Sequence, residues 1–351
     1  MKSAFNWSPH HPTNMLRIAS YNIENLDFSK PDWTPTLEDR IPVLRASLNR
    51  LKADIICFQE VHGQELDDHT EDHDSRDLLA LKKVLEGTPY ANYEIASTLT
   101  QSGVVRNKRN LVIASKFPIL EFDQHWNDFC PAPAYQKATE ILDDDEESEA
   151  KDIKWERPIQ YAKIDLGPLG PLHVINLHLK SKIPSSVKGQ MVPIPNTRFH
   201  YWKTASAWAE GYFVSSMKRV GQALEVRMLL DKIFDQEPEA KIVVCGDFNA
   251  EPGQVPVEAI LGRVENTGNP ALQPTVLVPC SRSIPESIRY SHLHHGHGNL
   301  LDHILISQSM MHHFESAQLF NETLHDESMP GAWDNKFPES DHAPFLAIFD
   351  A

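Results

Sequence analysis

Short apolar runs that end in polar residues recur along the chain. Runs with the length and β-branched content of strands lie at 17–26, 53–61, 110–119, 159–166, 172–181, 241–250, 301–307 and 343–351. Apolar residues at helical spacing predict helices at 35–52, 74–86 and 204–236. Strands and helices are therefore intermixed, and no linker or internal repeat divides the sequence. We predict one mixed α/β domain at 16–351, preceded by an N-terminal extension at 1–15.

The charge balance narrows the class of function. The 351 residues carry a net charge of −16, from 33 basic and 49 acidic side chains. Such a balance argues against a protein that binds nucleic acid tightly over its whole surface. A nuclease is still compatible with it, because an enzyme needs only a local basic patch, and a bound metal ion adds positive charge at the phosphate.

The cysteines and the N-terminal residues indicate the compartment. The four cysteines are widely spaced, give no zinc pattern, and are expected to be buried free thiols. Residues 1–15 lack the apolar core of a signal peptide, and no apolar run reaches the length of a transmembrane helix. We therefore expect a cytoplasmic protein without a transmembrane segment.

Polar residues at the ends of the predicted strands are the first candidates for chemistry. Asp247 and Asn249 close the run KIVVCGDFNA and point the same way on an extended chain. They could serve chemistry, or they could form an Asx turn that caps the strand. Glu60 ends DIICFQE, and Asn22 ends IASYN. A carboxylate in that position is either a surface residue or a ligand for a hard cation such as Mg²⁺.

The strand at 172–181 carries one polar face, formed by Asn176, His178 and Lys180. This pattern suits a strand that lines a cleft, where Asn176 and Lys180 would contact substrate, and it equally suits a solvent-facing edge. Asp302 opens another strand, and Asp341 and His342 precede the last one. An imidazole paired with a carboxylate can move protons near neutral pH.

Six of these segments form an ordered series. SYNIENL, FQE, NLHLKS, GDFN, LDHILIS and SDHAP resemble the motifs of the endonuclease/exonuclease/phosphatase (DNase I-like) superfamily, from about residue 16 to the C-terminus. The resemblance implies an α/β fold of the α+β type: a four-layer sandwich of two packed mixed β-sheets flanked by helices. It also implies a Mg²⁺-dependent hydrolase of phosphodiester bonds, with Mn²⁺ as an alternative ion and a nuclease as the first candidate.

The resemblance also assigns roles to the metal-binding and water-binding residues. It makes Glu60 the main metal ligand, with Asn22 and Asp341 beside it. Asp247 and Asn249 would position or activate the attacking water and contact the phosphate.

Further roles follow for the histidines and for one arginine. His342 would pair with Asp302, and His178 would stabilise the transition state or protonate the leaving oxygen. Arg157, in WERPIQYA, resembles an arginine that contacts the substrate phosphate.

Several alternatives stay open at this point. Abasic-site endonucleases of this family carry tyrosine where His178 stands, so that branch is disfavoured. Inositol-phosphate phosphatases typically carry arginine where His303 stands, and the chain departs from that pattern. A phosphatase, a phospholipase C-like (sphingomyelinase-like) enzyme, and a non-catalytic binding protein on the same fold remain alternatives, since fold alone cannot choose among them. The expected partner is a nucleic acid or another phosphodiester; no protein partner is predicted.

Three irregular segments complete the sequence. Residues 143–149 are acidic and are expected to form a solvated loop. The segment from Lys180 to Lys203 combines cations with Phe199, Tyr201 and Trp202, so it is either part of a substrate groove or a surface loop whose aromatic residues pack onto the sheet. The histidines at 292, 294, 295 and 297 could hold a transition metal, but we expect a flexible loop beside the site because no second cluster in the sequence completes a coordination shell.

Overall fold

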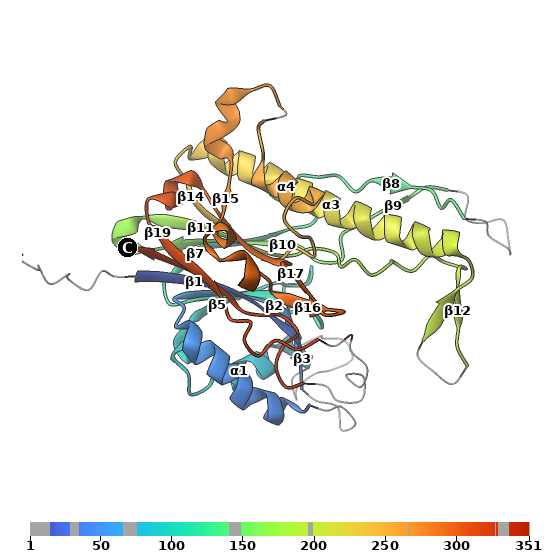
Figure 1. Ribbon diagram of the computed structural model, residues 1–351, viewed down its shortest axis with the longest axis horizontal. Helices are drawn as coiled ribbons and strands as arrows, with labels where there is room; N and C mark the ends of the chain where they lie inside the picture. Colours follow the sequence, from blue (N-terminus) through green and yellow to red (C-terminus); the bar gives the residue numbers. More distant parts are fainter. Residues whose placement is uncertain are drawn as a thin grey trace, which may run out of the picture.

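The computed structural model describes residues 15–28, 35–65, 76–139, 149–195, 199–265, 267–326, 328 and 337–350. Two six-stranded mixed sheets lie at its centre (Figure 1). The first sheet, in the order β19-β20-β1-β2-β6-β5, contains β1 (Met15–Leu26), β2 (Ile55–Val61), β5 (Glu94–Ser97), β6 (Asn110–Ser115), β19 (Phe314–Leu319) and β20 (Phe345–Asp350). The second, in the order β15-β18-β14-β11-β10-β7, contains β7 (Ile119–His125), β10 (Ile159–Asp165), β11 (Pro171–His178), β14 (Lys241–Asp247), β15 (Val278–Pro279) and β18 (Asp302–Ile306).

Helices cover the outer faces of both sheets. α1 (Leu37–Leu51) and α2 (Leu79–Leu85) cover the first sheet, and α3 (Ala205–Gln236) and α4 (Val255–Leu261) cover the second. The short α5 (Gln308–Met311) instead contributes Met310 to the core between the sheets. Short two-stranded pairs decorate the surface: β3 (Gln64–Glu65) with β4 (Arg76–Asp77), β8 (Ala134–Tyr135) with β9 (Lys151–Asp152), β12 (Met191–Pro193) with β13 (His200–Trp202), and β16 (His292–His294) with β17 (His297–Asn299). Within the described ranges, no helix combines the length and apolar character needed to span a bilayer.

Strand alternation produces the layers. On β1, Ile18 points into the apolar core between the sheets, whereas Ala19 and Tyr21 point toward the outer core beneath α1 and α2. On β11, Val174 joins the inner core and Ile175 joins the outer core beneath α3 and α4. The predicted four-layer sandwich is therefore confirmed, with one apolar layer between the sheets and one between each sheet and its helices.

Two predicted elements differ from the structure. The run 110–119 is two strands, because β6 ends at Ser115 in the first sheet and β7 begins at Ile119 in the second. Pro118 lies between them, and since proline has no N–H it cannot continue a ladder. The helix predicted at 74–86 is shorter, since β4 occupies 76–77 and α2 begins at Leu79. Within the acidic segment 143–149, only Glu149 lies inside the described residues.

Amide side chains fill part of the space between the sheets. Asn176 Nδ2 donates to the carbonyl oxygen of Phe58 at 3.1 Å and to Gln160 Oε1 at 3.0 Å. Its Oδ1 accepts from Gln59 Nε2 at 2.8 Å. We call Gln59, Gln160 and Asn176, all fully buried, the amide layer. The Asn176 side chain is fully buried and joins the two sheets, and its predicted substrate contact stays a prediction.

Candidate active site

Strand register brings the polar strand ends of the second sheet into a row. The parallel pairing of β11 and β14 places His178 opposite Asp247, and the antiparallel pairing of β14 and β18 places Asp247 opposite Asp302. Gly246 allows this close approach: its φ is +137°, and an added Cβ would lie 1.9 Å from the carbonyl oxygen of Leu177. Only glycine tolerates that position.

Asp247 is the centre of this row. Its Oδ2 accepts from Asn22 Nδ2 and Asn249 Nδ2, each at 3.1 Å, and lies 3.2 Å from His178 Nε2. Its Oδ1 accepts from the backbone N–H of Asn249 at 2.8 Å, so the turn that caps the strand also shapes the site. Burial alone would raise the pKa of Asp247, but His342 and His178 together hold it well below its usual range.

His342 forms the expected pair with Asp302. Its Nδ1 lies 2.7 Å from Asp302 Oδ2, and its Nε2 lies 3.9 Å from Asp247 Oδ2. Burial would lower the pKa of His342, yet the carboxylates of Asp302, Asp247 and Asp341 raise it well above its ordinary value. The metal-free site therefore favours a protonated His342 at neutral pH.

His178 has the opposite character. Burial, followed by the charge of Arg157, lowers the pKa of His178 despite the nearby Asp247 carboxylate. Its Nε2 also lies 3.7 Å from Glu60 Oε1, and its buried Nδ1 has no hydrogen-bond partner in the described part of the chain. His178 is therefore a neutral ring whose Nε2–H faces two carboxylates.

A break in strand alternation carries Glu60 into the site. Gln59 points between the sheets, so regular alternation would turn Glu60 to the outer face. Instead, Glu60 has a φ of +62° and lies at a register shift in β2, which redirects its side chain. Glu60 Oε2 accepts from the N–H of Asn25 at 3.0 Å. Burial would raise the pKa of Glu60, but the charges of His178 and Arg157 lower it.

The predicted metal ligands lie along this edge. The Glu24–Asn25 turn links them, because Asp341 N donates to Glu24 Oε2 at 3.3 Å and Asn25 N donates to Glu60. Carboxylates outnumber the cations here, and buried Asp302 Oδ1 has no hydrogen-bond partner among the described residues. This oxygen-rich, negatively charged set fits a hard divalent cation such as Mg²⁺.

Two groups of side chains have ligand atoms within 4.8 Å of one another: Asp247 with Asp302 and His342, and His292 with Asp341 and His342. Among the described residues, neither group includes Glu60. The sequence treats these residues as one set, whereas the structure places them in two clusters that share His342.

The predicted substrate-binding cations lie behind and beside the row. Buried Arg157 donates from Nη1 to the carbonyl oxygens of His178 and Leu179, at 3.2 and 3.1 Å. Lys180 Nζ donates to Ser181 Oγ at 3.2 Å, and burial lowers its pKa. Arg157 thus supports the strand end that carries His178. Phosphate contacts by Arg157 and Lys180 stay predictions.

The segment from Lys180 to Lys203 contains the β12–β13 hairpin, which lies near the N-terminal end of α3 (Figure 1). Phe199 and Tyr201 are each 54% exposed, so they do not pack onto the sheet. Lys182 lies 3.4 Å from Glu251, and Arg198 lies outside the described residues. A role of this segment in substrate binding stays a prediction.

Comparison with known sequences and structures now identifies the family. A sequence model of the endonuclease/exonuclease/phosphatase family matches residues 19–342. The chain belongs to this family. No curated protein matches the sequence. The predicted family is thereby confirmed, and the fold is that of hydrolytic phosphoesterases.

Solved structures of the same fold have diverse substrates in their names. Truncated TDP2 of Caenorhabditis elegans is 16% identical, with a TM-score of 0.53, and the match covers 96% of this chain and 98% of that one. A mannosyl-6-phosphatase of Bacteroides thetaiotaomicron is 17% identical, with a TM-score of 0.55 and coverage of 95% and 98%. The 3′ phosphatase NExo of Neisseria, bound to a product DNA hairpin, is 14% identical, with a TM-score of 0.52 and coverage of 96% and 100%. These likenesses support the fold alone.

Two residues of this family member were missed by the sequence interpretation. Exposed Arg109 has a φ of +57°, and its charge helps to lower the pKa of Glu60. Its only signal was the basic run at 106–109. His292 was assigned to a flexible loop, but it lies against Asp341 and His342. The other two members of its cluster, Asp341 and His342, lie about fifty residues later in the chain, so the spacing of histidines in the sequence does not reveal the cluster.

Proposed function

We propose that this protein hydrolyses phosphodiester bonds with the help of a divalent metal ion, and that its substrate is a nucleic acid. One observation carries the proposal: the buried Asp247 carboxylate lies between two histidines whose pKa values shift in opposite directions. The lowered pKa of Asp247 keeps that carboxylate ionised and the raised pKa of His342 keeps that ring protonated, so the two can act as proton acceptor and proton donor in one reaction.

The roles follow from the protonation states. Asp247 orients a water molecule, with Asn249 beside it, and accepts its proton as the new P–O bond forms. Protonated His342, held by Asp302, donates its proton to the leaving oxygen as the second P–O bond breaks. Neutral His178 donates a hydrogen bond to a phosphoryl oxygen on which negative charge grows. One proton enters at Asp247 and one leaves from His342, so the step is balanced.

The metal ion belongs to the Glu60 side of the site. Glu60, with Asn22 and Asp341, would hold it. When bound, such an ion neutralises phosphate charge and stabilises the transition state. Support comes from the oxygen ligands, which Mg²⁺ and Mn²⁺ prefer, and from the excess of carboxylates over cations.

A phosphatase acting on small phosphate monoesters is the second candidate. It is favoured by the net charge of −16 and by the pairing of nearby cations with carboxylates, as in Lys182–Glu251 and Lys218–Glu156. Such pairs weaken the local field that would attract a phosphate polymer. The mannosyl-6-phosphatase on the same fold keeps this candidate in view.

A substrate panel tests the proposal. The purified protein is incubated with Mg²⁺ or Mn²⁺ and plasmid DNA, single-stranded DNA, RNA, bis-p-nitrophenyl phosphate or p-nitrophenyl phosphate. We expect cleavage of a nucleic acid and of the diester, loss of both with EDTA, and cleavage reduced by orders of magnitude in Asp247→Asn prepared in parallel. Hydrolysis of the monoester alone would favour the phosphatase, and full activity after exhaustive chelation would remove the metal from the proposal.

A further inference from the structure

The β16–β17 hairpin holds a histidine against the active site. The backbone of His292 forms an isolated antiparallel bridge with that of His342. Next to this bridge, Ala343 N donates to the carbonyl oxygen of Ser291 at 2.8 Å. Ser291 Oγ in turn accepts from the backbone N–H of Asp302 at 3.0 Å. Backbone contacts thus fix His292 beside the Asp302–His342 pair.

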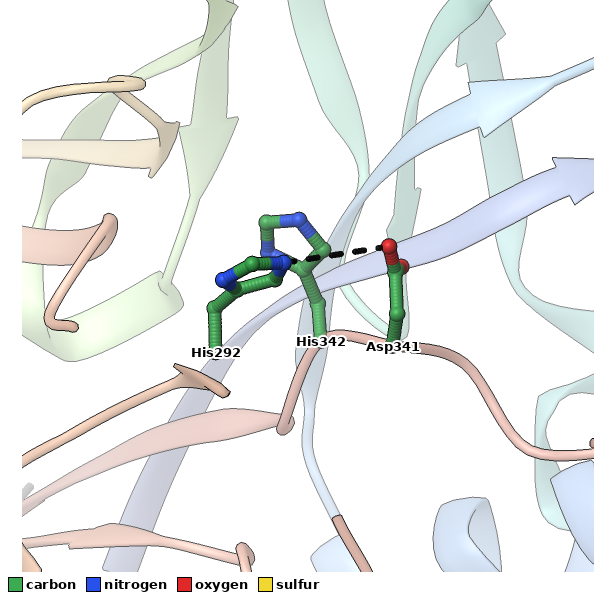
Figure 2. Close-up of side chains that lie close together, drawn as sticks. All are labelled: His292, Asp341 and His342. Carbon is green, nitrogen blue, oxygen red and sulfur yellow. Dashed lines mark ion pairs between the residues drawn. The ribbon is translucent and has the colours of Figure 1, made fainter. Parts of the chain in front are cut away.

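The side chains converge as well. His292 Nε2 lies 4.0 Å from Asp341 Oδ2, and the centroids of the His292 and His342 rings are 5.2 Å apart. One ligand atom from each of His292, Asp341 and His342 lies within 4.8 Å of the others, and Figure 2 shows the two rings and the carboxylate facing one another. His292 Nδ1 is buried and has no hydrogen-bond partner in the described part of the chain.

This geometry is close to that of a metal centre. A four-coordinate ion with bonds of roughly 2.0–2.2 Å places neighbouring ligand atoms roughly 3.3–3.6 Å apart. Side-chain shifts on the order of 1 Å would therefore bring the three ligand atoms into the coordination distances of such an ion. The His292 side chain is 20% exposed and that of Asp341 is 25% exposed, so an ion can enter from solvent.

The donor set also separates this cluster from the Glu60 side. Two imidazole nitrogens and one carboxylate favour a transition metal such as Zn²⁺, Co²⁺ or Mn²⁺, whereas oxygen ligands alone favour Mg²⁺. Asp302 holds Nδ1 of His342 at 2.7 Å, which orients the opposite nitrogen, Nε2, as a ligand. A carboxylate behind a histidine is the usual support of a metal-binding imidazole.

We propose that His292, Asp341 and His342 form a transition-metal site that takes Zn²⁺ or Co²⁺ and shares Asp341 with the Mg²⁺ position at Glu60. The inference rests on the proposed function only in that it places His342 in the catalytic machinery. An ion at this site would take Nε2 of His342 as a ligand, so that atom is not available to the leaving oxygen while the ion is bound.

Metal binding by the full-length, metal-stripped protein tests the site. Co²⁺ is titrated while its visible absorption is followed, because nitrogen ligands change the spectrum of the hydrated ion; Zn²⁺ binding is measured by calorimetry. We expect one Co²⁺ to bind to the wild type with a changed spectrum, and His292→Ala to weaken this binding by at least about tenfold. His294→Ala is the matched control, since His294 lies on the same hairpin, is exposed, and stands outside the group.

Each outcome decides the inference. It is overturned if the wild type gives no spectrum of nitrogen-bound Co²⁺, if His292→Ala binds as well as the wild type, or if His294→Ala loses as much affinity. His292→Gln keeps a polar side chain of similar size, and equal melting temperatures of both His292 variants and the wild type exclude misfolding. Glu60→Gln should bind Co²⁺ normally while losing Mg²⁺-supported hydrolysis. Because the measurement is metal binding, it can separate this site from the proposed function. If the wild type shows no hydrolysis but His292→Ala still weakens Co²⁺ binding, the proposed function is contradicted and the metal site is supported.

Discussion

Asn176 and His178 lie two residues apart on the same face of β11, yet they belong to different polar regions. Asn176 is part of the amide layer, where its donors and its acceptor are engaged between the sheets. His178 lies at the edge, where its Nδ1 has no hydrogen-bond partner among the described residues and its Nε2 faces Asp247 and Glu60.

The comparison teaches how to separate structural from chemical polar residues. Both side chains are buried, at 0% and 2% exposure, so burial does not distinguish them. What differs is whether their hydrogen bonds are satisfied. A buried polar group whose donors and acceptors all have partners stabilises the fold, whereas a buried group with an unpaired donor or acceptor needs another explanation. Four predictions test this difference, from the largest expected effect to the smallest.

The largest effect is expected at the edge. Asp247→Asn should lower kcat by roughly 10²–10⁴-fold, because it removes the group that accepts the proton of water. The melting temperature should stay within a few degrees of wild type, since the amide keeps most hydrogen bonds of the carboxylate. Steady-state kinetics and thermal unfolding measure both. Turnover near the wild-type value would show that Asp247 is not the base.

The amide layer should respond in the opposite way. Asn176→Ala should lower the free energy of unfolding by about 2–4 kcal/mol, because buried Gln160 Oε1 loses its donor and Gln59 Nε2 loses one of its three acceptors. KM and kcat of the folded fraction should change little. Urea denaturation gives the first quantity, and kinetics at low temperature give the second. An increase in KM with unchanged stability would instead support the predicted substrate contact of Asn176.

The two histidines should differ when each becomes glutamine. Glutamine can replace the neutral donor of His178, but it cannot carry the proton of His342. We therefore expect kcat of His342→Gln to be lower than that of His178→Gln by about tenfold or more. The ratio of kcat values for the two purified variants is the measurement. Equal losses would mean that the protonation states do not differ in the working enzyme.

The smallest effect is a titration difference in the metal-free protein. His342 should titrate above its ordinary pKa because carboxylates surround it, and His178 should titrate below its ordinary pKa because of burial and Arg157. NMR of the imidazole rings measures both, and Asp302→Asn should lower the value for His342. The raised pKa of His342 in the folded protein means that its protonation stabilises the fold. This contribution is fully present below about pH 6.5 and is lost as the pH rises through the pKa of the folded state. Asp302→Asn should therefore cost more stability at pH 5.5 than at pH 9, and the reverse order would contradict the assignment.

Much of the fold could be read from local patterns. The apolar runs located the main strands because alternation and β-branched content are properties of neighbouring residues. The ordered motifs located Asp247, Asp302, His178 and His342 because these residues stand at strand ends. Pro118 was a local signal for a break within 110–119, but the pairing of β7 with β10 in the second sheet depends on segments far along the chain.

The sequence by itself determined the family, the strand ends that carry chemistry, and the excess of acidic residues. Tertiary structure decided how those residues divide. Asn176 lies fully buried between the sheets. The left-handed backbone conformation of Glu60 turns its side chain into the site. The backbone bridge between His292 and His342 brings His292 close to Asp341 from a distant segment of the chain. The physical reason is that periodicity records which face a side chain takes. Partners, depth and charge depend on segments far away in the chain, and these determine what the side chain can do.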